Sequence, residues 1–98
     1  MSYKIRVSPI TQSHIENAFY YYKNKASLTV AINFKNSLAQ VYKILLINPF
    51  FEIRAQNYRA IPLKNFPYII FFEVDEAHME VKVIAIFNTN RNTEKYPR

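Results

Sequence analysis

The side chains of this chain that could do chemistry are mostly cationic. Lysine and arginine together number 13 and aspartate and glutamate seven, so the formal net charge is +6. The excess is concentrated in residues 1–72, which hold nine basic and two acidic side chains. Such a basic body suits a polyanion or an acidic protein partner. Residue types with AT-rich codons, such as Lys and Asn, are abundant, so genome composition could also explain part of the lysine excess.

Composition excludes several kinds of site. The chain has no glycine, which removes the glycine-rich loops whose backbones approach phosphates closely. It has no cysteine, so disulfides, thiolate metal sites and cysteine nucleophiles are impossible. The two histidines, His14 and His78, are far apart in sequence and lack the spacing of metal ligands. We therefore expect no metal and no cofactor.

The length and hydropathy of the chain favour a single domain in the cytoplasm. Ninety-eight residues fit one domain, which would span residues 1–98. Residues 1–9 lack the apolar core of a signal peptide. The longest apolar run, residues 68–72, is far shorter than a membrane-spanning helix.

Two helices are predicted in the first half of the chain. Pro9 suits a first helical turn, and apolar residues at i, i+3, i+4 and i+7 predict a helix over residues 11–25. Ser27 can cap a second helix, whose apolar positions continue at spacings of three and four up to the stop at Asn48-Pro49. Because the link between the helices is short, they should form an antiparallel hairpin.

Strands are predicted before and after this helical hairpin. Alternating or continuous apolar patterns indicate strands over residues 3–7, 58–63, 68–74 and 79–87, with a loop over residues 50–56 and a polar tail over residues 88–98. The fold class is therefore α+β in the order β-α-α-β-β-β. The last three strands should form an antiparallel meander, with both helices on one face of the sheet.

The strand predicted over residues 68–74 (YIIFFEV) is apolar on both faces. One alternating set should pack on the helices. The other set would be an exposed apolar patch, which usually marks a partner surface. Alternatively, residues 50–56 or 88–98 could cover that patch.

Several segments occur together in an order typical of one protein family. They are the opening YKIRVSPITQSHIENAFYYY, Asn57-Tyr58-Arg59, Phe66-Pro67-Tyr68 before an apolar strand, and Ile84-Ala85-Ile86-Phe87 leading to Arg91. With the element order, this series resembles the RelE/ParE superfamily, the toxin halves of bacterial type II toxin–antitoxin pairs. The resemblance implies a toxin that a small antitoxin protein neutralises. RelE-like members cut messenger RNA in the ribosomal A site, whereas ParE-like members poison DNA gyrase.

The resemblance also implies candidate site residues. Arg59 and Arg91 match arginine positions that would clamp a phosphate, and Tyr96 lies near the position of a C-terminal tyrosine that would donate or accept a proton or stack on a base. Further residues implied to contact the nucleic acid or other target are Lys64, Lys95 and Arg98. Those implied to contact the antitoxin are Tyr68, Ile70 and Phe72.

Other interpretations of these residues remain open. Arg59 could be a scaffold residue that pairs with Glu73 across strands. Tyr96 could be a packing aromatic, because the ending also resembles a ParE-like His-x-x-Arg-Asp-Pro-x-x-Trp pattern in which Asn88 replaces the histidine. This chain has only part of the dense set of lysines that RNA-cutting members carry. A ParE-like toxin is therefore slightly favoured over a ribosome-dependent ribonuclease, and a non-toxic binding module on the same scaffold is the third possibility.

Overall fold

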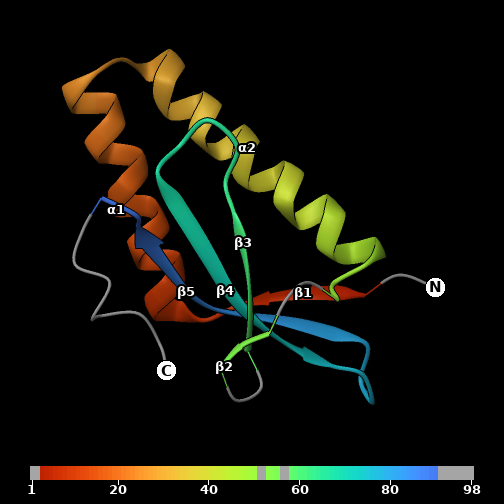
Figure 1. Ribbon diagram of the computed structural model, residues 1–98. Helices are drawn as coiled ribbons and strands as arrows, with labels where there is room; N and C mark the ends of the chain where they lie inside the picture. Colours follow the sequence, from red (N-terminus) through yellow and green to blue (C-terminus); the bar gives the residue numbers. More distant parts are fainter. Residues whose placement is uncertain (1–2, 51–52, 56–57, 91–98) are drawn as a thin grey trace.

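The computed structural model describes residues 3–50, 53–55 and 58–90. A pair of helices lies over one face of a single mixed sheet (Figure 1). The elements in chain order are β1 (Lys4–Val7), α1 (Pro9–Lys25), α2 (Leu28–Ile47), β2 (Ile53–Ala55), β3 (Tyr58–Pro62), β4 (Tyr68–Asp75) and β5 (Glu80–Asn88). The predicted α+β class and the order of the six predicted elements are confirmed, and the short strand β2 is an addition to them.

Both helices begin at a serine cap, as the sequence predicts. The Ser8 hydroxyl oxygen accepts a hydrogen bond from the backbone N–H of Thr11 at 3.2 Å, and Pro9 occupies the first turn of α1. The Ser27 hydroxyl oxygen accepts one from the N–H of Val30 at 3.1 Å. These bonds satisfy N–H groups that have no partner inside the helix. The caps therefore fix where each arm of the helical hairpin starts.

The sheet has the strand order β1-β5-β4-β3-β2. β1 pairs with β5 in parallel, and the other neighbouring strands pair antiparallel. β1 and β5 are the first and last strands in the sequence, yet they lie side by side in the sheet. The segment predicted as a loop over residues 50–56 contains β2, a strand of three residues. That strand is too short to give a periodic sequence signal.

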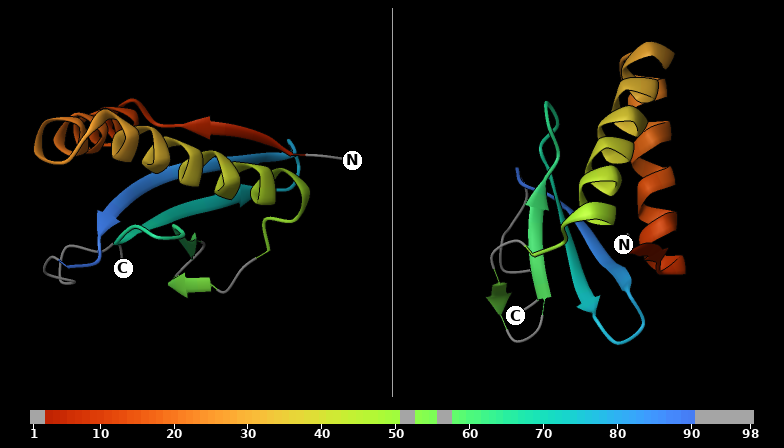
Figure 2. Two further views of the ribbon diagram at one scale, coloured as in Figure 1. Left: turned by 90° about the horizontal axis from the view of Figure 1, so that it is seen from above. Right: turned by 90° about the vertical axis from the view of Figure 1, so that its right-hand side faces the viewer.

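The main core lies between the helices and the sheet (Figure 2). Apolar residues of α1 and α2 meet one side of β3, β4 and β5 there. The fully buried members are Ile15, Phe34, Leu45, Ile70, Phe72 and Val81. A second, smaller cluster contains the buried residues Tyr58, Ile69 and Phe71, which alternate with the helix-side set along β3 and β4. Both faces of the sheet are therefore apolar.

A bulge in β5 changes which of its residues face the helices. Phe71 pairs with Ala85 and Phe72 with Val83, so Ile84 is an extra residue in the ladder. Strict alternation would put Ala85 on the side of Val83. Instead, Ala85 joins Ile84 in the second cluster, and Ile86 turns to the helix side. A strict two-residue alternation along β5 therefore holds before the bulge and fails after it.

Candidate functional site

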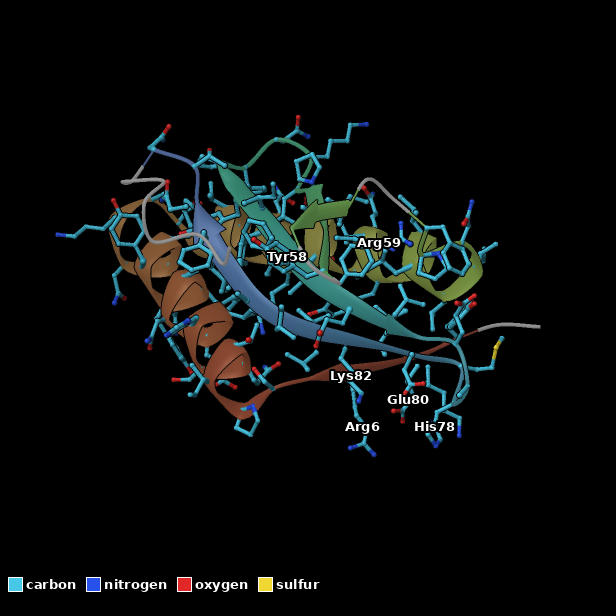
Figure 3. The ribbon with its side chains drawn as sticks, turned by 60° about the horizontal axis from the view of Figure 1, so that its bottom comes forward. Arg6, Tyr58, Arg59, His78, Glu80 and Lys82 are labelled. Carbon is cyan, nitrogen blue, oxygen red and sulfur yellow. The ribbon has the colours of Figure 1, made fainter. Side chains whose placement is uncertain are left out.

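Arg59 is a predicted site residue that lies near the start of β3, the strand next to the β2 edge of the sheet. It lies on β3, opposite Phe72 of β4 and Ile53 of β2. Its guanidinium carbon is 5.3 Å from the centre of the Phe50 ring, which is a cation–π distance. In Figure 3, Arg59 lies across β4 from Arg6 and Glu80. Phe50 lies three residues beyond the last residue of α2, so the segment after the helix brings an aromatic ring to this strand.

A hollow of about 430 Å³ lies beside Arg59, at the end of β4 that extends beyond β3. Its described lining contains Phe50, Arg59, Glu73, Val74, Asp75, Glu76 and Lys82. Three of these side chains are carboxylic acids and two are cationic. A phosphate in this hollow would meet negative charges as well as Arg59, so the lining is poorly suited to a phosphate clamp. The hollow fits a mixed or basic partner surface better.

The carboxylate of Asp75 is held by the β4–β5 turn. Its Oδ1 accepts a hydrogen bond from the backbone N–H of His78 at 3.2 Å, and its Oδ2 is 2.9 Å from the His78 ring Nδ1. The Lys82 Nζ is 3.7 Å from the same Oδ2. The His78 side-chain hydrogen bond is the main reason why the pKa of Asp75 is lowered from its ordinary value. A carboxylate with a lowered pKa is a weak general base.

Glu73 lies opposite Tyr58 in the β3–β4 ladder, and Arg59 lies opposite Phe72. Arg59 and Glu73 are therefore offset by one position in the β3–β4 ladder, and their predicted pairing across strands stays a prediction. Arg59 and Glu73 nevertheless line the same hollow.

Lys64 lies in a different place from Arg59. It is exposed in the turn between β3 and β4, whereas Arg59 lies near the start of β3. Five residues of extended chain span roughly 17 Å, so the two cations cannot clamp one phosphate together. Lys64 instead lines a groove against α2, together with polar residues of that helix. The sequence places both residues near β3, but only the structure shows that they serve separate surfaces.

The residues predicted to bind an antitoxin lie on the helix side of β4. Ile70 and Phe72 have no exposed surface and are packed under α1 and α2. Tyr68 is half-buried against the same core, with its ring 5.4 Å from that of Phe34. The prediction of a docking surface was therefore wrong for Ile70 and Phe72, because this alternating set faces the helices.

The opposite face does not carry the open apolar patch expected from the sequence. Ile69 is 6% exposed and Phe71 is 1% exposed. Around them, Ala60, Ile84 and Phe87 are half-buried. The centre of this face is thus closed and only its rim meets solvent.

The remaining predicted site residues, Arg91, Lys95, Tyr96 and Arg98, lie outside the described residues. Their predicted roles as phosphate clamp, proton donor or target contact stay predictions. Within residues 3–50, 53–55 and 58–90, no group of three or more acidic or histidine side chains could hold a metal ion. Neither described helix has the length and hydropathy that crossing a membrane requires.

Sequence reasoning missed two features of these surfaces. The first is Phe50, which it left in a loop although the ring contacts Arg59. The second is the row Asn33, Asn36 and Gln40 on α2, which lines the groove beside Lys64. Their spacing of three and four residues was a usable signal for a polar stripe on one helix face.

Comparisons with known proteins identify the fold. No family model matches the chain, and no curated protein sequence is significantly similar to it. Among solved structures, a chain of the chromosomal ParDE TA system from P. aeruginosa aligns with a TM-score of 0.74 at 12% identity, over 88% of this chain and 95% of that one. The isolated E. coli RelE toxin aligns with a TM-score of 0.56 at 18% identity, over 92% and 87%.

An archaeal RelE–RelB complex from Pyrococcus horikoshii OT3 also contains a similar chain, with a TM-score of 0.58 at 11% identity, over 94% of this chain and all of that one. At such low identities the likeness establishes the fold alone. The chain has the fold of the ParE and RelE toxins along nearly its whole length. The resemblance predicted from the sequence is confirmed at this level.

Proposed function

We propose, from the fold shared with ParE and RelE toxins, that this chain is the toxin of a toxin–antitoxin pair and is held inactive by a cognate antitoxin protein. Three of the similar structures are complexes of a toxin with its antitoxin or an antitoxin peptide, two from E. coli and one from P. horikoshii. The net charge of +6 suits an acidic partner protein. The proposed place of action is the cytoplasm.

We further propose a ParE-like action on DNA gyrase in preference to RNA cleavage. The observation that carries this choice is the setting of Arg59. Cleavage through a 2′-hydroxyl needs a base, an acid and cations that hold the phosphate as charge develops. Arg59 shares its hollow with Glu73, Asp75 and Glu76, and Lys64 lies at the other end of β3. The higher TM-score to the ParDE chain, 0.74 against 0.56 for RelE, agrees with this choice.

A RelE-like ribosome-dependent ribonuclease is the second candidate. The E. coli RelE structure shares 18% of its residues with this chain, against 12% for the ParDE chain. If the chain is such a ribonuclease, Arg91 and Tyr96 catalyse RNA cleavage, and Lys95 and Arg98 bind the RNA. Arg59 then contributes little to catalysis.

The test is induced expression of the chain alone, with protein synthesis and DNA synthesis labelled separately. A gyrase poison stops DNA synthesis and causes DNA damage while translation continues. A ribonuclease stops translation first, and Arg91→Ala or Tyr96→Phe abolishes that effect. Harmless growth with folded protein present would reject both toxins and leave the binding module.

A supercoiling assay with purified gyrase separates the two toxins outside the cell. A ParE-like toxin inhibits supercoiling, and the Arg91→Ala and Tyr96→Phe variants keep most of that inhibition. Unchanged supercoiling at toxin concentrations well above that of gyrase would contradict the ParE-like proposal.

A further inference from the structure

A groove of about 370 Å³ lies between α2 and the β3–β4 turn, away from the hollow beside Arg59. We call it the α2–turn groove. Its described lining is Asn33, Asn36, Ser37, Gln40, Lys64, Asn65 and Phe66. The volume falls in the range of ordinary ligand sites. Four of these seven side chains are carboxamides.

The helix wall of the groove carries free hydrogen-bonding groups. Asn33, Asn36 and Gln40 follow each other at spacings of three and four residues, which places them on one face of α2. All three side chains are exposed. Within the described parts of the chain, their carboxamides make no hydrogen bond to another protein group. Each therefore presents donors and an acceptor to whatever enters the groove.

The turn wall is fixed in position relative to the helix. The Ser37 hydroxyl donates a hydrogen bond of 2.7 Å to the backbone carbonyl of Lys64, and Ser37 is buried. The N–H of Leu63 donates to the carbonyl of Tyr68 at 2.9 Å, which closes the turn. Asn65 adopts φ 69°, a left-handed conformation that asparagine tolerates well. A groove with fixed walls loses little entropy when it binds a ligand.

The charge of the groove is positive. Lys64 is the charged residue of the described lining, and no carboxylate belongs to that lining. Lys43 follows Gln40 by three residues along α2 and is also exposed. Beyond it, Ile44 and Ile47 are 46% and 78% exposed. The face of α2 that lines the groove thus continues beyond it with a second cation and two exposed apolar side chains.

This lining favours a peptide over a nucleic acid. Phe66 is the aromatic residue of the described lining, and its ring already makes edge contacts with the rings of Tyr22 and Phe34 at 5.3 Å and 5.6 Å. Because the ring is partly buried and already packed against two other rings, it is a poor platform for stacking a base. The Lys64 ammonium group would also neutralise only one of the several phosphate charges of a nucleic acid strand. Carboxamides, in contrast, match the N–H and C=O groups of an extended peptide.

We propose that the α2–turn groove binds an extended, acidic segment of a partner protein. Asn33, Asn36 and Gln40 pair with the main chain of that segment, and the Lys64 Nζ pairs with an Asp or Glu carboxylate. Lys43 and Ile47 meet the continuation of the segment along α2. This site is separate from the Arg59 hollow and does not depend on the toxin function or its target.

The test uses the purified full chain and a phage library of random 12-residue peptides. Peptides selected on the wild-type chain should be rich in Asp and Glu. Synthetic copies should bind Lys64→Glu about tenfold more weakly, the loss expected for one charged hydrogen bond. Asn36→Leu should also weaken binding. The matched controls, Lys25→Glu and Asn17→Leu, change exposed residues of α1 and should leave the affinity unchanged.

The position of the peptide is measured by NMR on the isotope-labelled chain, with thermal unfolding to verify that each variant is folded. Amide shifts confined to residues 33–47 and 63–66 support the proposal. It is overturned if no acidic peptide is enriched, if Lys64→Glu binds the peptides as well as the wild type, or if the shifts fall elsewhere. A uridine 12-mer that displaces the peptide from the groove, or a dimer of the chain that Lys64→Glu disrupts, would also overturn it.

Discussion

The two faces of the sheet are both apolar, but they differ in what covers them. On the helix side, Ile70 and Phe72 are completely buried beneath α1 and α2. On the opposite side, Tyr58 and Phe71 are buried within a small cluster whose rim residues, such as Phe87, remain half-exposed. One face carries the main core, and the other carries a smaller cluster of buried residues.

The difference shows that an apolar strand does not by itself reveal a docking surface. β4 alternates between the two clusters, and its central residues on both faces are closed to solvent. The accessible features lie at the ends of the strands: the mixed-charge hollow beside Arg59 and the α2–turn groove beside Lys64. Partner contacts are therefore expected at these edges and along the helices.

The largest expected effect compares Phe72→Ala with Phe71→Ala. Loss of the Phe72 ring should lower the free energy of unfolding by about 3–5 kcal/mol, because it leaves a cavity in the main core. Phe71→Ala should cost less, because the smaller cluster can relax around the missing ring. Urea denaturation measures both values. Equal losses would show that the second face is as deep a core as the first.

A second comparison concerns an unsatisfied group on the helix side. The Tyr42 hydroxyl is buried without a hydrogen-bond partner, and burial raises the pKa of Tyr42 to about 12. Because the unfolded tyrosine ionises near pH 10, the folded state should lose stability as the pH rises from about 10 towards 12. Tyr42→Phe should remove that part of the alkaline loss, which is no more than about 2 kcal/mol.

The same substitution should not destabilise the protein at pH 7, since it removes a polar group that has no partner. Chemical denaturation at pH 7 and pH 11 tests both statements. Tyr21→Phe is the matched control, because Tyr21 is 58% exposed. A marked destabilisation by Tyr42→Phe at pH 7 would mean that the hydroxyl does have a partner in solution.

A third prediction concerns the bond between the helical layer and the sheet. Ser37→Ala removes the hydrogen bond to the Lys64 carbonyl and should cost about 1 kcal/mol. Ser13→Ala, at an exposed position of α1, should change stability by less than about 0.5 kcal/mol. Thermal unfolding compares the two variants. If Ser37→Ala is as neutral as its control, the turn is held by other contacts.

The smallest effect is expected at the β4–β5 turn, at one end of the sheet. His78→Ala should raise the pKa of the Asp75 carboxyl towards its ordinary value, because the ring hydrogen bond is the main cause of the lowering. Lys82→Gln should raise that pKa less.

NMR titration of the carboxyl carbon of Asp75 measures both changes. The stabilisation associated with the lowered pKa is present above the ordinary pKa of aspartate and is lost as the pH falls through the folded-state value. An identical titration curve in His78→Ala would contradict the assigned cause.

Much of the fold could be predicted from short stretches of sequence. Ser8, Pro9 and Ser27 mark the helix starts, and the spacing of apolar residues gives the buried helix faces. The candidate site was less accessible to such reasoning. The sequence correctly puts Arg59 on a strand, but Phe50 and Asp75 reach its neighbourhood from other elements. Contacts between distant segments leave no local pattern to detect.

The sequence by itself determined the order of elements, the absence of glycine-loop and thiolate chemistry, and the apolar nature of both faces of β4. Only the tertiary structure decided which face of the sheet the helices cover. It also decided that the bulge at Ile84 changes which side chains of β5 point to the helices, and that Arg59 and Lys64 belong to different surfaces. The physical reason is the distance along the sequence over which each interaction acts. Caps and helical periodicity act within a few residues, whereas facing and register depend on the pairing of distant strands.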